Sequence, residues 1–153
     1  LKIFAGSLPS SLAKLAHKGV RLTVYGLRQR MGGNHGDEEF DFEKLTVYQL
    51  ALEFLDRIFE VCRGLPADVR YPLGDQLIRA GLSISNNLAE GSGKRSKKAK
   101  VQYYGTSLDS TRECISMFNV LKRQRLIQAD RYTQLRQQGR RITGMLRGLI
   151  DSV

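Results

Sequence analysis

Basic side chains in the C-terminal half of the chain are the residues best suited to chemistry, and that chemistry is phosphate binding. They form three sets: Lys94, Arg95, Lys97, Lys98 and Lys100; Lys122, Arg123 and Arg125; and Arg131, Arg136, Arg140, Arg141 and Arg147. The spacing of Arg136, Arg140 and Arg147 places them on one face of a helix, and the planar guanidinium fork matches a phosphate group. The first set lies at the predicted start of a helix, where positive charge opposes the helix dipole. A purely solvating role therefore explains it poorly.

The net charge is concentrated in the same half. Residues 1–36 carry six basic and no acidic side chains, residues 37–91 carry five and eleven, and residues 92–153 carry fourteen and four. The total is +10, with a pI near 9.9. Such an excess favours a polyanionic partner. We predict binding to the phosphates of RNA or DNA by Lys94, Arg95, Lys97, Lys98, Lys100, Lys122, Arg123, Arg136, Arg140 and Arg147.

Residue types that support catalysis are poorly represented. The only histidines, His17 and His35, lie before the predicted helices, and the chain has no CxxC motif and no Glu-x-x-His pair. Cys62 and Cys114 have no histidine nearby in sequence to activate them, so reduced, packed thiols are expected, as in a cytosol. The glycine-rich turn at residues 91–96 lacks the GxxxxGK[ST] spacing of a phosphate loop. We predict no catalytic site, no metal and no cofactor.

A segment rich in short polar side chains lies just before the basic residues. Leu77, Ile84 and Leu88 mark a helix with one apolar stripe, yet this helix also carries serines and asparagines that an ordinary core helix avoids. Two interpretations stay open, a surface site for a ligand and a hydrogen-bond network between helices. We favour the network, because it would fix the register of the helices. Its predicted members are Ser83, Asn87, Glu90 and Ser107.

The elements expected to position these residues are four helices, over about 41–63, 72–91, 96–124 and 130–153. Short loops between consecutive helices require antiparallel neighbours, so the fold class is all-α, an antiparallel up-down four-helix bundle. In the first helix, Leu45, Tyr48, Leu52, Leu55 and Phe59 follow the spacing of a buried stripe. Val101 is expected in the core from the third helix, and Gly91 is expected to end the second in a left-handed conformation.

Two domains of unequal kind are predicted. Residues 1–36 form a basic, flexible N-terminal extension with a glycine-rich end at residues 32–36. Residues 37–153 form the bundle. No apolar run reaches the length of a membrane span, and we expect a cytoplasmic protein without a membrane partner.

The polar helix and its flanks resemble the four-helix-bundle proteins encoded in intervening sequences of bacterial 23S rRNA genes. Their shared core reads roughly Q-L-x-R-A-x-x-S-I-x-x-N-I-A-E-G, and the matching residues are Gln76, Leu77, Arg79, Ala80, Ser83, Ile84, Asn87, Ala89, Glu90 and Gly91, with Leu88 for the isoleucine. Residues 42–49 resemble the opening helix of the family, and residues 103–108 resemble the start of its third helix. The resemblance covers about 40–153. Ser110 stands where relatives often have an acidic residue, and Glu113 is one turn further on.

This resemblance implies more than the spacing alone. Known relatives are homopentameric rings, and the related accessory variability protein of diversity-generating retroelements is a basic pentamer that binds nucleic acid and a reverse transcriptase. The resemblance therefore implies a homo-oligomer, a pentamer, with a protein partner such as a reverse transcriptase. We expect a non-enzymatic nucleic-acid-binding assembly factor. The alternative is a protein–protein interaction scaffold that docks to an acidic partner without nucleic acid.

Overall fold

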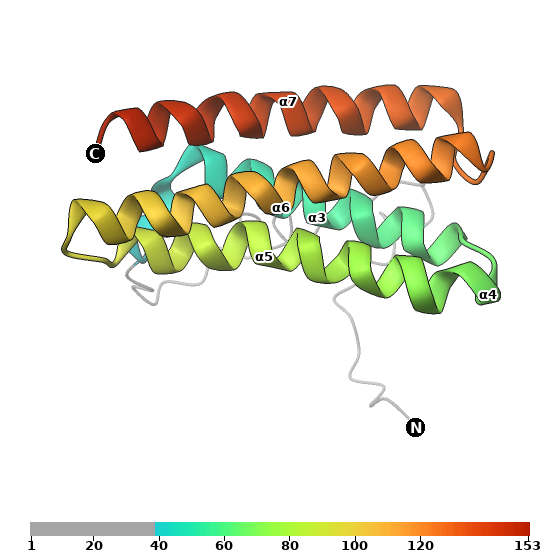
Figure 1. The fold of residues 1–153 in the computed structure, drawn as a ribbon, viewed down its shortest axis with the longest axis horizontal. Helices are drawn as coiled ribbons and strands as arrows, with labels where there is room; N and C mark the ends of the chain where they lie inside the picture. The colour runs from blue at the N-terminus through green and yellow to red at the C-terminus, as the bar shows by residue number, and fades with distance from the viewer. Residues whose placement is uncertain (1–38) are drawn as a thin grey trace, which may run out of the picture. The chain divides into compact units, whose positions relative to one another are not determined.

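The computed structural model describes residues 39–153, which form four long helices and no strand in that range. The long helices are α3 (Thr46–Gly64), α5 (Asp75–Ser92), α6 (Lys97–Arg123) and α7 (Ala129–Asp151) (Figure 1). A 3₁₀ turn, η1 (Asp41–Lys44), precedes α3. A short helix α4 (Ala67–Val69) and a π-type turn η2 (Arg70–Gly74) join α3 to α5. The all-α prediction is confirmed, whereas the predicted extension at residues 1–36 lies outside the described residues.

The four helices pack in a square. Helix α5 packs against α3 and α6, and α7 packs against α6 and α3, so α3 and α6 lie on one diagonal of the bundle. The short turns after α5 and α6 make each pair antiparallel (Figure 1). Ser96 caps α6 by accepting a 3.1 Å hydrogen bond from the backbone N–H of Ala99. Arg125 reverses the chain after α6 in a left-handed conformation, with φ of 57°.

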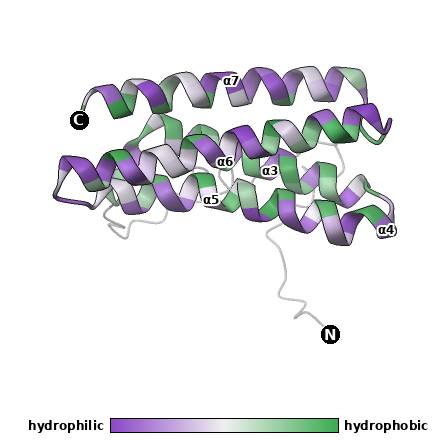
Figure 2. Cartoon of the chain, in the orientation of Figure 1, coloured by the Kyte–Doolittle hydropathy of each residue, from purple (hydrophilic) through white to green (hydrophobic). Residues whose placement is uncertain are grey.

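The core consists of apolar side chains from all four helices, and several of its largest members are fully buried. Phe54 of α3 and Phe118 of α6 meet edge to face, with ring centroids 5.9 Å apart. Around them lie the fully buried side chains Ile58, Leu77, Ile84, Leu88, Leu121, Leu135, Ile142 and Leu146. Figure 2 shows many hydrophilic residues along α6 and α7, so these two helices combine core residues with a largely polar remainder.

The predicted stripe of α3 is rotated by about one residue. Val47, Ala51, Phe54 and Ile58 are buried, whereas Leu52 and Phe59 are only partly buried. Apolar residues occupy more than half of the circumference of α3, so their spacing alone could not select the arc that faces α5 and α7. Leu55 is the one member of the predicted stripe whose side chain is buried.

Two further predictions were wrong. Val101 is 40% exposed, because it lies on the outer face of α6. Gly91 does not end its helix, since α5 continues to Ser92 and the next residue, Gly93, has a negative φ of −77°. A Cβ on Gly91 would lie 2.6 Å from the Tyr104 ring. The glycine therefore permits close approach of α5 and α6.

Candidate nucleic-acid interface

A groove of about 470 Å³ runs along the interface between α6 and α7. We call it the arginine groove, because four arginines line it: Arg112 from α6, and Arg136, Arg140 and Arg147 from α7. The other lining residues are Ile115, Ser116, Asn119, Gly139, Thr143 and Gly144. All four arginines are exposed, so their guanidinium groups are available to a ligand. Hydroxyl and amide groups beside them add neutral hydrogen-bonding partners for phosphate or sugar oxygens.

The three arginines of α7 occupy one face of that helix, as their spacing indicated. Arg112 was not among the predicted residues. It lies on the opposite wall and makes a 3.0 Å ion pair with Asp109 on its own helix, with both side chains more than half exposed. Surface pairs of this kind contribute little to stability. An incoming anion therefore has little to displace at Arg112. Spacing within one helix gives no signal for a residue that joins from another helix.

Tyr132 holds one end of the groove in place. Its hydroxyl donates a 2.8 Å hydrogen bond to the side-chain oxygen of Asn119 and accepts a 2.7 Å hydrogen bond from Arg136. The ammonium group of Lys122 lies 4.2 Å from the centre of the Tyr132 ring, within range of a cation–π interaction. Because Tyr132 is only 8% exposed, its hydroxyl is held in place and fixes the position of the Arg136 side chain. Lys122, a predicted binding residue, thus lies beside the groove.

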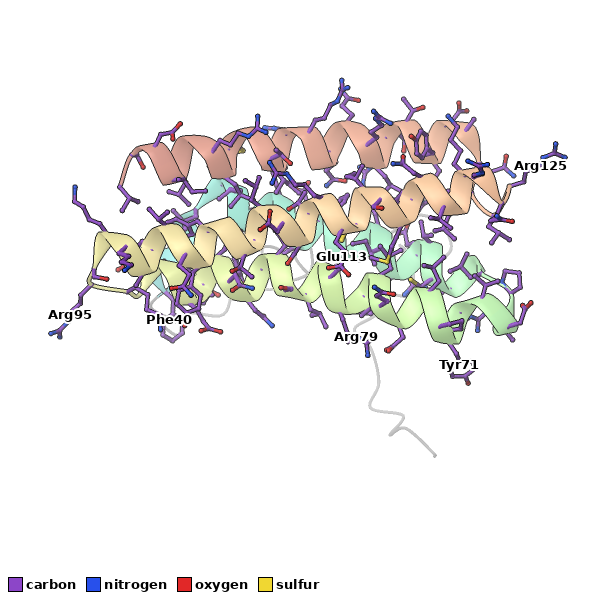
Figure 3. The ribbon with its side chains drawn as sticks, in the orientation of Figure 1. Phe40, Tyr71, Arg79, Arg95, Glu113 and Arg125 are labelled. Atoms are coloured by element: carbon purple, nitrogen blue, oxygen red, sulfur yellow. The ribbon has the colours of Figure 1, made fainter. Side chains whose placement is uncertain are left out.

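The first basic set lies at the other end of α6. Helix α6 has 27 residues, so at a rise of about 1.5 Å per residue Lys97 and Lys122 are about 37 Å apart along its axis. In Figure 3, Arg95 and Arg125, which lie just beyond the two ends of α6, project from opposite ends of the bundle. Lys94 lies over the Tyr103 ring at 4.6 Å, whereas Arg95, Lys97 and Lys98 are exposed. The predicted residues therefore divide between the groove and two ends of the bundle.

The remaining arginines of α7 face α3. Arg131 forms an ion pair with Glu60, and both side chains are about one-third exposed. Arg141 lines a separate polar hollow of about 460 Å³ with Glu53, Arg57 and three glutamines. Neither residue belongs to the arginine groove.

Two glycines of α7 line the groove, and only one of them is required by the packing. A Cβ on Gly139 would lie 2.6 Å from the Cδ1 atom of Ile115, so glycine is needed there for α6 and α7 to approach. A Cβ on Gly144 would meet no atom within 4 Å. Ile115 is partly buried and packs on the core. The groove consequently has an apolar floor between two charged walls.

The predicted polar network lies at the α5–α6 interface, with different contacts from those expected. Ser107 is fully buried and donates a 2.9 Å hydrogen bond to the backbone oxygen of Ile84. Asn87 does not reach Ser107. Its amide instead donates to the backbone and hydroxyl oxygens of Ser83, because Ser83 lies one turn earlier on the same face. The Glu90 side chain is exposed and makes no hydrogen bond to another side chain or to the backbone within residues 39–153.

The Ser83 hydroxyl connects α5 to α6 through the hydroxyl of Ser110. The Oγ of Ser83 lies 2.8 Å from the Oγ of Ser110, which in turn donates to the backbone oxygen of Thr106. Since the single hydroxyl hydrogen of Ser110 is used at Thr106, Ser83 must donate to Ser110. The result is a directed chain from Asn87 through Ser83 and Ser110 to the α6 backbone. Such chains strengthen each member.

Charge differs between the two halves of the described bundle. Residues 39–91 carry five basic and nine acidic side chains, a net −4, whereas residues 92–153 carry fourteen and four, a net +10. Helices α6 and α7 are neighbours, so they form the basic half and α3 with α5 form the acidic half. A polyanion is therefore attracted to the half that holds the groove.

Catalytic and metal chemistry find little support in the described residues. Burial raises the pKa of the Cys114 thiol to about 12 and also raises the pKa of Cys62. A thiol held neutral in this way is a poor nucleophile. Residues 39–153 contain no group of three histidine, cysteine or acidic side chains placed to hold a metal. Within that range no helix is long and apolar enough to cross a membrane.

Comparison with known proteins identifies a family that the chain matches. A family model described as 23S rRNA-intervening sequence protein matches residues 43–148. The fold is similar to that of a protein of unknown function from the S23 ribosomal protein family of Bacteroides thetaiotaomicron, with a TM-score of 0.64. The two chains are 23% identical over 69% of this chain and 95% of the other. No curated protein sequence matches the chain.

Proposed function

Because this chain belongs to the 23S rRNA-intervening sequence protein family, we propose that it is a non-enzymatic, nucleic-acid-binding assembly factor that works as a homo-oligomer. The observation that carries the proposal is the arginine groove, in which two adjacent helices present four exposed guanidinium groups to one space. Guanidinium groups pair with phosphate through parallel N–H···O bonds. The ligand is RNA or DNA, bound through its backbone.

The surrounding charge supports this proposal. The lysine-rich end of α6 adds Arg95, Lys97 and Lys98 as exposed cations, and a strand leaving the groove would meet further positive charge there. No element in residues 39–153 has the form of a known groove-reading motif, so little sequence preference is expected. Binding is then dominated by the release of counterions.

Self-association is the second part of the proposal, and a homopentamer is the form that the resemblance to ring-forming relatives implies. Helix α3 lies diagonally opposite α6, and its Leu52 and Phe59 side chains are only partly buried. Contacts between copies through α3 would leave the arginine groove open. Light scattering should then give five times the 17.3 kDa mass of one chain, and replacing Leu52 and Phe59 by lysine should lower that mass.

Fluorescence anisotropy with labelled RNA and DNA tests the nucleic-acid proposal directly. Replacing Arg136, Arg140 and Arg147 together by glutamine should weaken binding at low salt by about 100-fold, since each lost phosphate contact contributes about 1 kcal/mol. The slope of log affinity against log salt should become shallower by about 2–3. Replacing Arg57, Arg63 and Arg79, which lie in the acidic half, changes the net charge equally and should leave binding within about threefold.

The groove and the lysine-rich end can be separated in the same assay. Replacing Lys94, Arg95, Lys97 and Lys98 by glutamine should also weaken binding, but less than the groove variant because these residues gather at one end of the bundle. Circular dichroism should show unchanged helix content in each variant. If the wild-type protein binds neither RNA nor DNA at low salt, the proposal fails.

The alternative is a scaffold that docks to an acidic protein. The arginines that suit phosphate also suit carboxylate, as the pair between Arg112 and Asp109 illustrates. This alternative predicts capture of an acidic protein partner by a chain that does not bind nucleic acid. Loss of that capture in the groove variant would then identify the same surface as the docking site.

A further inference from the structure

Gly144 has no role in the bundle that requires glycine. It lies inside α7, is exposed, and a Cβ there would meet no atom within 4 Å. Glycine weakens a helix relative to alanine, because it loses more conformational freedom on folding. Gly139, five residues earlier, is explained by its contact with Ile115. The open space at Gly144 is space inside the arginine groove.

The groove is small. Its volume is about 470 Å³, and Arg112 of α6 and the arginines of α7 line it together. A duplex is too large to enter such a space, and its bases are stacked inside, away from the apolar floor at Ile115. A single strand has one backbone for the arginines and exposed base faces for the floor.

The side chains of α7 that line the groove form a continuous row. Arg136, Arg140, Thr143 and Arg147 are spaced by four, three and four residues, which keeps them on one face over about 16 Å of helix. A strand that follows this row meets an arginine or a hydroxyl at every turn of the helix. Gly144 is next to the row and lets the strand approach the backbone of α7.

We propose that the arginine groove binds single-stranded nucleic acid, with the sugar–phosphate backbone running along α7 and passing over Gly144. This inference rests on the proposed nucleic-acid binding and adds the form of the ligand and its path. The absent side chain at Gly144 is what makes room for the strand. Filling that space blocks the path without changing the charge of the protein.

The test compares two glycines of α7 in the full-length protein. Gly144→Leu fills the groove, and Gly148→Leu is the matched control, because Gly148 is also exposed, also has open space at its Cβ and does not line the groove. Both variants replace a helical glycine, so both should keep or raise the thermal midpoint. A labelled 12-nucleotide single strand, as RNA and as DNA, and the duplex of the same sequence serve as probes at one salt concentration.

We expect the wild-type protein to bind the single strands at least about tenfold more tightly than the duplex. Gly144→Leu should lose about tenfold in single-strand affinity, Gly144→Ala should lose less, and Gly148→Leu should bind like wild type. Equal binding of duplex and single strand, or equal effects of the two leucine variants, would overturn the inference while leaving nucleic-acid binding intact. Absence of binding to every probe by the wild-type protein would instead defeat the proposed function itself.

Discussion

The α5–α6 interface and the α6–α7 interface share helix α6 but differ in their polar side chains. Buried hydroxyl groups lie in the first interface, whereas exposed arginines line a groove along the second. At the α5–α6 interface Ser107 and Ser110 of α6 are both buried and both hydrogen-bonded, and at its exposed edge Glu113 accepts a 3.2 Å hydrogen bond from Gln76 of α5. At the α6–α7 interface the polar side chains of α6 are Arg112, Ser116 and Asn119, all exposed along the groove. One helix thus presents two kinds of polar surface.

The difference follows from the size and charge of the side chains. A serine hydroxyl is short enough to bond a nearby backbone oxygen, so it is buried without losing hydrogen bonds. A guanidinium group has five donors and a permanent charge, which makes burial without a carboxylate costly. The arginines therefore stay in solvent, and the two helices leave a groove between them. Polar residues at a helix interface indicate a binding surface when their side chains stay exposed to solvent, as those of the groove arginines do.

The largest change in stability is expected at the closed interface. Ser107→Leu removes the hydrogen bond to Ile84 and adds bulk at a fully buried position, so it should lower the free energy of unfolding by about 2–3 kcal/mol. Ser116→Leu, nine residues later on the groove side, should change it by less than about 0.5 kcal/mol. Chemical denaturation measures both. Equal losses would show that the two interfaces do not differ as described.

A smaller effect is expected from the hydroxyl pair that crosses this interface. In a double-mutant cycle with Ser83→Ala and Ser110→Ala, the coupling free energy should be about 0.5–1.5 kcal/mol. Asn87→Leu should cost about 1 kcal/mol or less, because the amide bonds only within α5. A coupling near zero would mean that the hydroxyl chain does not hold α5 to α6.

The smallest effect is expected at the thiol of Cys114, which lies on α6 between the α5–α6 and α6–α7 interfaces. Cys114 is fully buried next to Ile115 of the groove floor, and the burial that raises its pKa to about 12 should leave it unmodified by iodoacetamide at pH 8. The unfolded protein, in which both cysteines react, is the control. Rapid labelling of the folded protein would show that the groove opens into the core.

The same pKa fixes the sign of a pH dependence. The thiol loses its proton near pH 9.0 when free and near 12 in the folded protein, so the folded state holds a proton that the unfolded state has lost in that window. The contribution of Cys114 to stability is therefore complete below about pH 9 and declines as the pH rises from 9 towards 12. Cys114→Val should make the decline shallower.

The sequence by itself determined the helices and the polar character of α5. Spacing located the long helices to within a few residues and the common face of Arg136, Arg140 and Arg147, because both depend on rotation about a single helix axis. It also indicated that Ser83 and Ser107 belong to contacts between helices. Whether residues 1–36 form a separate extension stays a prediction.

Only the tertiary structure decided which helix faces meet. It rotated the buried stripe of α3, made Gly91 a packing residue beside Tyr104, and brought Arg112 opposite the arginines of α7. It also separated the basic residues into a groove and two ends, which lie apart because α6 is long and straight. Spacing along one helix gives the angle of a side chain about that helix and nothing about its neighbour. The neighbours here are selected by packing among residues distant in sequence, and the groove exists only where two such helices meet.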